Sequence, residues 1–178
     1  TGLPNRRLFE ERLACALDEP GTCHALMFID LDRFKAVNDN GGHAAGDELL
    51  RRVSRDLVNA IRGTDRLARL GGDEFGIVLP NCGPEDALRI AQRLREITEA
   101  IDFVWSGHRY SISASIGVVH LGGRGYTLQE ALRAADIACY MAKEKGRNRV
   151  HVYETSDAAQ NQFTVNLNWV QRLHRALE

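Results

Sequence analysis

The sequence predicts an α+β fold in which helices cover a mixed, largely antiparallel central sheet. First, residues 23–32, "CHALMFIDLD", form a continuous apolar run closed by acids, which is typical of a strand buried on both faces. Second, several longer stretches carry apolar residues at helical spacing. Third, residues 68–80, "ARLGGDEFGIVLP", place two glycines between two short apolar runs, as a β-hairpin does. Because hairpins and helical crossovers both occur, the sheet is antiparallel or mixed rather than wholly parallel.

The first half of the chain predicts two helices around the buried strand. Residues 3–19 begin with the helix-start residues Pro4 and Asn5 and continue with an apolar stripe at helical spacing. After the strand at 23–32, residues 41–63 show the same spacing and stop at Gly63. The hairpin of residues 68–80 follows.

The second half predicts two more helices, each followed by a strand. Residues 83–101 form a helix with Pro84 near its first turn, and residues 110–120 alternate in polarity and are rich in β-branched residues. Residues 127–145 form a helix that ends at Gly146, and residues 149–153 form a short last strand. The polar stretch that follows predicts a domain over 1–153, with 154–178 as a linker and a helix leading toward a following domain.

Composition narrows the classes of function. The chain has 178 residues, 44% hydrophobic and 26% charged, as expected for one globular domain, and it reads as a piece of a longer protein. A net charge of -1 argues against nucleic acid and anionic lipid as partners but allows a small anionic ligand. The four cysteines lack metal-binding spacing, which favours a reduced, cytoplasmic setting. No run of ~18 apolar residues occurs, so we expect no membrane contact by this segment, and any anchor would lie outside it.

Four carboxylates form the strongest candidate for a site. Asp30 and Asp32 end the buried strand, and Asp73 and Glu74 lie on the hairpin turn. If the two strands are neighbours, repulsion between these groups raises their pKa values unless a cation binds. Mg²⁺ commonly takes one or two carboxylates together with substrate phosphates, so a Mg²⁺-nucleotide site is indicated. The alternative is that "DLD" only caps the next helix and "GGDE" only makes a turn.

The sequence signal for residues that would bind the phosphates is less specific than the signal from the carboxylates. The chain has no Walker motif, so Lys35 and the basic stretch "KEKGRNR" (143–149) are the candidates. That stretch is equally compatible with a solvated helix end. The six histidines show no ligand spacing, and Ser113 and Ser115 lack the pattern of a catalytic nucleophile.

Six ordered motifs together resemble the GGDEF family of diguanylate cyclases over residues 1–153: "TGLPNRR", "FIDLDRFKAVND", "GHAAGDELL", "RGTDRLARLGGDEF", "SASIGVV" and "ADIACYMAKEKGRN". The resemblance implies a palm-like fold akin to class III nucleotidyl cyclases. It implies metal binding by Asp30 and Glu74, by the backbone carbonyl of Leu31, and by Asp73, which would also accept the 3′-hydroxyl proton. Asp73, Glu74 and Lys35 would then be the catalytic residues.

The same resemblance implies how GTP is held. Asn38 and Asp47 match the pair that reads the guanine edge, while Lys35, Lys143 and Arg147 match the phosphate contacts. Two GTP molecules would become cyclic di-GMP and two pyrophosphates, with two Mg²⁺ (or Mn²⁺) ions in each half-site. Because each domain holds one GTP, the reaction requires a homodimer, which can be transient.

Regulation is also implied. Arg62 and Asp65 in "RGTD" stand five residues before the GGDEF motif and match a site where the product cyclic di-GMP inhibits many family members. The alternative is an ion pair at a helix end. A second function remains open, a GTP-binding module that controls an adjacent EAL phosphodiesterase domain, because the "NWVQRLHRALE" tail resembles the helix that joins such domains. A structural or nucleic-acid-binding palm is disfavoured by the neutral charge and the intact guanine-reading positions.

Overall fold

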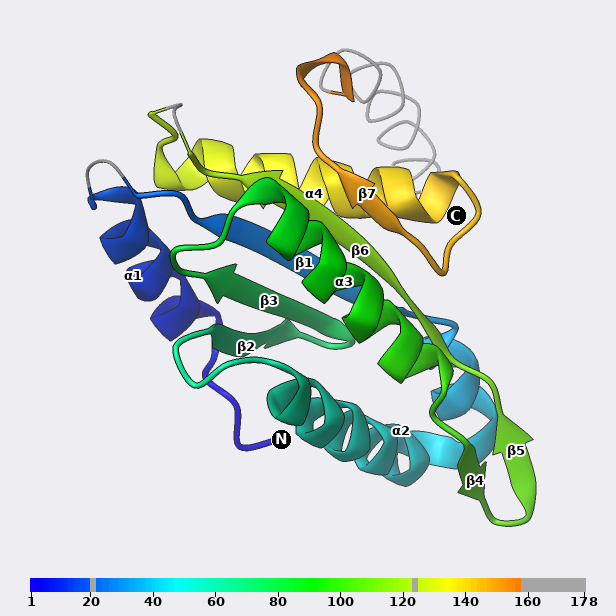
Figure 1. Cartoon of the computed structure of the whole chain (residues 1–178). Helices are drawn as coiled ribbons and strands as arrows, with labels where there is room; N and C mark the ends of the chain where they lie inside the picture. The colour runs from blue at the N-terminus through cyan, green and yellow to red at the C-terminus, as the bar shows by residue number, and fades with distance from the viewer. Residues whose placement is uncertain (20–21, 123–124, 158–178) are drawn as a thin grey trace, which may run out of the picture.

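A five-stranded sheet lies between two layers of helices in the computed structural model, which describes residues 1–19, 22–122 and 125–157 (Figure 1). The helices are α1 (Arg6–Leu17), α2 (Phe34–Ala60), α3 (Pro84–Glu99) and α4 (Leu128–Glu144). The sheet strands are β1 (Ala25–Asp32), β2 (Arg66–Gly71), β3 (Glu74–Leu79), β6 (Ser113–His120) and β7 (Val150–Val152). A separate hairpin joins β4 (Phe103–Trp105) to β5 (His108–Tyr110).

The sheet has the order β2-β3-β1-β6-β7. β1 pairs antiparallel with β3 and with β6, β2 pairs antiparallel with β3, and β7 runs parallel to β6. The predicted mixed, largely antiparallel sheet is therefore confirmed. The strand that ends in the acidic "DLD" stretch is the central one.

Alternate residues of β1 enter two different cores. Met27 and Ile29 lie in the core under α2 and α3, whereas Leu26 lies in the core under α1 and α4. This alternation follows from the two-residue period of a strand, and it explains why the run reads as continuously apolar. Within the described residues, none of the helices has the length and apolar character required to cross a membrane.

A glycine lets α4 lie directly on the sheet. A Cβ atom on Gly117 of β6 would stand 2.2 Å from the backbone nitrogen of Cys139 in α4. Only a residue without a side chain permits this approach. The close packing fixes the end of α4, and with it Lys143, against the central strands.

Two predicted boundaries were wrong, and a third falls largely outside the described residues. α2 begins at Phe34 rather than at residue 41, because two helical segments meet at Gly42, whose φ of 77° interrupts the helical backbone. β6 begins at Ser113 rather than at residue 110, since Tyr110 belongs to the β4–β5 hairpin, which sequence patterns did not predict. Of the predicted linker and helix at 154–178, residues 158–178 lie outside the described residues, so that boundary stays a prediction.

Candidate functional site

The end of β1 and the turn between β2 and β3 bring the predicted acidic residues together. Asp30 stands opposite Glu74 in the β1–β3 register, and the backbone N–H of Leu31 donates to the carbonyl oxygen of Asp73 at 3.2 Å. The sheet therefore places Asp30, Leu31, Asp73 and Glu74 side by side. This is the convergence that the sequence predicted for two neighbouring strands.

The Asp30 carboxylate lies in a surrounding that favours a bound cation. Its side chain is 13% exposed, and its carboxylate lies 2.6 Å from Lys143 Nζ. Burial raises the pKa of Asp30 to about 6; Lys143 opposes this shift, whereas Asp73 and Glu74 add to it. Burial by itself would lower the pKa of Lys143, but the hydrogen bond to Asp30 and the charges of Asp30, Cys139 and Asp73 together outweigh burial and raise that pKa. The lysine ammonium thus neutralises part of a carboxylate cluster.

The donor set fits a hard divalent cation. Asp30, Asp73 and Glu74 offer carboxylate oxygens, and Leu31 offers a backbone carbonyl, which are the ligand types that Mg²⁺ prefers. Within the described residues, no three His, Cys, Asp or Glu side chains form a ready metal-binding group. The donors from Asp30, Leu31, Asp73 and Glu74 suit an ion that takes one or two protein carboxylates and completes its coordination shell with phosphate oxygens and water.

Glu74 is more open than Asp30. Its side chain is 51% exposed and lies 3.7 Å from the guanidinium of Arg6 at the start of α1. An ion pair this exposed adds little to stability. Glu74 is therefore free to exchange its partner when a ligand binds.

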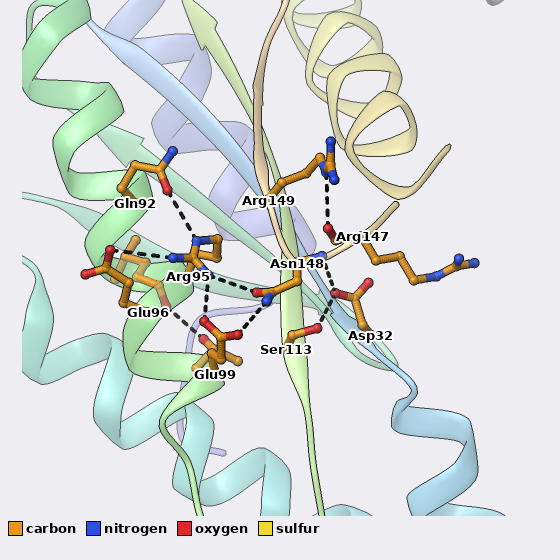
Figure 2. Close-up of polar contacts among 11 residues, drawn as sticks. Asp32, Gln92, Arg95, Glu96, Glu99, Ser113, Arg147, Asn148 and Arg149 are labelled. Atoms are coloured by element: carbon orange, nitrogen blue, oxygen red, sulfur yellow. Dashed lines mark hydrogen bonds and ion pairs between the residues drawn. The ribbon is translucent and has the colours of Figure 1, made fainter. Parts of the chain in front are cut away.

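Asp32 does not belong to the acidic site, contrary to the expectation from its spacing. It is 4% exposed, and its carboxylate accepts hydrogen bonds from Ser113 Oγ (2.7 Å), Ser115 Oγ (2.8 Å) and the backbone N–H of Asn148 (3.0 Å). Figure 2 shows Asp32 between Ser113 and the loop that carries Asn148. These donors use the acceptor capacity that a metal ion would need, so Asp32 serves the fold.

The two predicted guanine-reading residues lie together across the kink of α2. A Cβ atom on Gly46 would stand 2.0 Å from Asn38 Oδ1, so the Asn38 amide rests directly on the Gly46 backbone. Asp47 is the next residue and is exposed. The kink at Gly42 turns the chain back, which places an amide and a carboxylate on neighbouring turns.

The predicted phosphate-binding residues come from two regions. Lys35 is exposed in the first turn of α2, whereas Lys143 ends α4 and Arg147 follows in an exposed loop. Arg147 and Asn148 both have left-handed backbone conformations, with φ of 60° and 47°. Sequence patterns singled out the whole basic stretch of residues 143–149 but gave Asn148 no role of its own.

Arg62 and Asp65 form a tight turn before β2. The backbone N–H of Arg62 donates to Asp65 Oδ2 at 2.8 Å, and the N–H of Asp65 donates to the Arg62 carbonyl at 3.0 Å. Among the described residues, no ion pair joins the two side chains, so the alternative interpretation as a helix-end ion pair is wrong. The turn leaves the Arg62 side chain exposed.

Comparisons with known proteins agree with this geometry. The sequence model described as "Diguanylate cyclase, GGDEF domain" matches residues 1–149. The probable diguanylate cyclase DgcE of Escherichia coli (strain K12) is 46% identical over 162 residues, which cover 89% of this chain and 15% of DgcE. The bifunctional diguanylate cyclase/cyclic di-GMP phosphodiesterase MucR of Pseudomonas aeruginosa is 40% identical over 182 residues, covering 100% of this chain and 26% of MucR. The chain thus spans only a minor part of these relatives.

Solved structures show the same fold. The GGDEF domain of TpbB (YfiN) from Pseudomonas aeruginosa matches with a TM-score of 0.85 and 40% identity, over 91% of this chain and 96% of that one. The GGDEF domain of DgcB from Caulobacter crescentus, solved in complex with c-di-GMP, matches with a TM-score of 0.81 and 28% identity, over 85% and 92%. These neighbours confirm the palm-like fold. With its family match over residues 1–149 and its carboxylates gathered on the GGDEF turn, the chain belongs to the GGDEF diguanylate cyclase domain family.

Proposed function

We propose that this domain is a diguanylate cyclase that condenses two GTP molecules into cyclic di-GMP and releases two pyrophosphates. The observation that carries the proposal is the meeting of Asp30, Asp73 and Glu74 at the end of the central strands, with Lys143 held against Asp30. The family match and the relatives named as diguanylate cyclases support the same activity.

The residues divide the chemistry between them. Bound Mg²⁺, two ions in each half-site, would lower the pKa of the attacking 3′-hydroxyl and spread the charge of the leaving pyrophosphate. Asp73 accepts the proton of that hydroxyl, and Lys35, Lys143 and Arg147 bind the phosphates. Asn38 and Asp47 hydrogen-bond the guanine edge, an arrangement that rejects adenine because the polar groups of the site would stay without partners.

Each domain holds one GTP, so two domains must face each other. A twofold homodimer brings the 3′-oxygen of one nucleotide to the α-phosphate of the other and requires no further catalytic surface. Cyclic di-GMP then inhibits by binding at Arg62 and Asp65, where the exposed arginine can engage a guanine edge or a phosphate. A second arginine, Arg93 on α3, is exposed and could complete a bridge between domains.

A second function is favoured by one relative. The cyclic di-GMP phosphodiesterase PdeB of Shewanella oneidensis is 36% identical over 184 residues, covering all of this chain and 21% of PdeB. In a protein of that kind the domain would bind GTP and regulate a neighbouring phosphodiesterase domain. The two functions differ in whether bound GTP is turned over.

One assay separates them. Purified domain at high concentration is incubated with GTP and Mg²⁺, and the nucleotides are resolved by chromatography. We expect cyclic di-GMP and pyrophosphate from the wild type, no product from Asp73→Ala with its fold intact, and little turnover of ATP. GTP binding without product would favour the regulatory module, and equal turnover of ATP and GTP would contradict the guanine assignment.

A further inference from the structure

Asn148 forms hydrogen bonds with three residues on two elements of the fold, β1 and α3. Its backbone N–H donates to Asp32 on β1 (3.0 Å), its Oδ1 accepts from Arg95 on α3 (3.1 Å), and its Nδ2 donates to Glu99 on α3 (2.7 Å). Figure 2 shows these bonds converging on one residue between the sheet and the helix. An asparagine that uses its backbone and both ends of its amide has a single available orientation.

The partners of Asn148 are themselves fixed. Asp32 is 4% exposed and held by Ser113 and Ser115. Arg95 is 17% exposed, and its Nη1 also contacts Glu99 at 2.7 Å. The bonds from Arg95 and Asn148 lower the pKa of Glu99, so Glu99 stays an ionised acceptor near neutral pH. Because each of these three partners also bonds to another residue, its bond to Asn148 costs little additional conformational entropy.

The backbone of Arg147 and Asn148 has a conformation that requires such restraining contacts. Arg147 and Asn148 are consecutive residues with positive φ, of 60° and 47°, and neither is glycine. Left-handed backbone costs on the order of 1 kcal/mol for such residues and persists where the surroundings enforce it. Asparagine tolerates this conformation better than arginine does, so the bonds of Asn148 hold its neighbour as well.

The contacts of Asn148 also restrain the neighbouring residue, Arg147. Its N–H donates to the Ala142 carbonyl at 3.1 Å, which leaves Arg147 between the end of α4 and Asn148. Figure 2 shows the Arg147 side chain extending away from Arg95 and Glu99. A guanidinium on a loop restrained from both sides has fewer orientations to lose when it binds a phosphate.

We propose that Asn148 is a positioning residue that fixes Arg147 for the phosphates of GTP, with Asp32, Arg95 and Glu99 as its anchors. This role rests on the proposed cyclase function. Asn148 sets the affinity for GTP and does not touch the reacting atoms. The effect of changing Asn148 therefore passes through Arg147.

A double-mutant cycle tests this coupling. Affinity for a non-hydrolysable GTP analogue with Mg²⁺ is measured by calorimetry in Arg147→Ala, Asn148→Gly and the double variant. Arg147→Ala should weaken binding by about 10- to 150-fold, as expected for a lost charge-assisted contact. Asn148→Gly keeps the positive φ and removes only the amide bonds, and we expect about 5- to 10-fold weaker binding. In the double variant Asn148→Gly should add no more than about twofold, because its effect passes through Arg147.

A matched control separates positioning from general destabilisation. Asn81 is an exposed asparagine that also has a positive φ (49°), it lies on the turn before α3 rather than in this loop, and its contact to His24 uses only the backbone N–H. Asn81→Gly should leave GTP affinity unchanged, and thermal unfolding of each variant monitors the fold. If Asn148→Gly does not fold, Glu99→Ala removes one anchor through a side chain that is 50% exposed and should also weaken binding.

The outcomes are distinct. If the wild type binds GTP but Asn148→Gly binds as tightly, or if the two losses multiply in the double variant, the positioning role is wrong while the cyclase function stands. If the wild type does not bind GTP, the proposed function fails, and the role of Asn148 fails with it.

Discussion

Replacing Gly46 by alanine tests whether Asn38 reads the base, because the two residues are in contact. A Cβ on Gly46 would lie 2.0 Å from Asn38 Oδ1 and 3.0 Å from its Cγ. Since ordinary van der Waals contact begins near 3.4 Å, the amide must move by about 1.4 Å or more. That displacement takes Asn38 out of hydrogen-bonding reach of a base placed by Asp47.

The same substitution has little reason to harm the fold. Gly46 lies in the helical part of α2 after the kink, and alanine is favoured over glycine there by up to about 1 kcal/mol. The displaced Asn38 is only half-buried, although the tip of the Phe34 ring, 3.1 Å from the new Cβ, must also give slightly. We expect the free energy of unfolding to change by no more than about 1 kcal/mol in either direction.

Binding and stability should therefore separate. Calorimetry with Mg²⁺ should show GTP affinity reduced by about 5- to 150-fold, the loss expected when a polar edge is left without its partner. Gly83→Ala is the control, because a Cβ there meets nothing within 4 Å. GTP affinity within about twofold of the wild type in a folded Gly46→Ala domain would show that Asn38 does not read guanine.

Three further predictions address packing, metal binding and regulation. Gly117→Ala should lower the free energy of unfolding by about 3 kcal/mol, because its Cβ would meet the backbone of α4; a loss under about 1 kcal/mol in a denaturant titration would contradict that packing. Since the pKa of Asp30 rises from 3.8 to about 6 on folding, stability without metal should fall as pH rises through that window. Mg²⁺ binding requires the ionised form, so its affinity should drop up to about tenfold per pH unit below 6, and a flat Mg²⁺ titration between pH 5 and 7 would refute this. Arg62→Ala should weaken cyclic di-GMP binding by about 10- to 150-fold with unchanged initial rates, and progress curves that plateau as early as those of the wild type would argue against product inhibition at this turn.

Local patterns predicted the order of the main elements because each carries its own signal, such as the apolar run of β1 and the stripe of α1. They did not predict the β4–β5 hairpin, whose strands have three residues each and show no alternation. The hairpin is stabilised instead by contacts among its aromatic rings, with Phe103 and Tyr110 at 6.0 Å. Such contacts depend on pairing that a linear sequence does not display.

In the site, too, local sequence signals predicted some features, while others depend on contacts between distant parts of the chain. The sequence placed Asp30 and Asp32 at the end of the buried strand, and both do end β1. Which of the two carboxylates stays available depends on the neighbouring strand, because Ser113 and Ser115 of β6 stand beside Asp32 and donate hydrogen bonds to it. The hydrogen bonds of Asn148, on which its proposed role rests, could not be predicted either, since its partners lie 49, 53 and 116 positions away along the chain.

The place of Asp30 and Glu74 in the sheet bears on how such a domain can be switched. β1 and β3 each pair with a neighbour on both sides, so the backbone that carries Asp30 and Glu74 cannot shift without breaking a ladder of backbone hydrogen bonds. In the proposed cyclase, each domain would therefore carry a half-site whose backbone is always assembled. What a regulator could still adjust is how often, and at what angle, two such half-sites meet, so control would act on encounters between domains rather than on the shape of either domain.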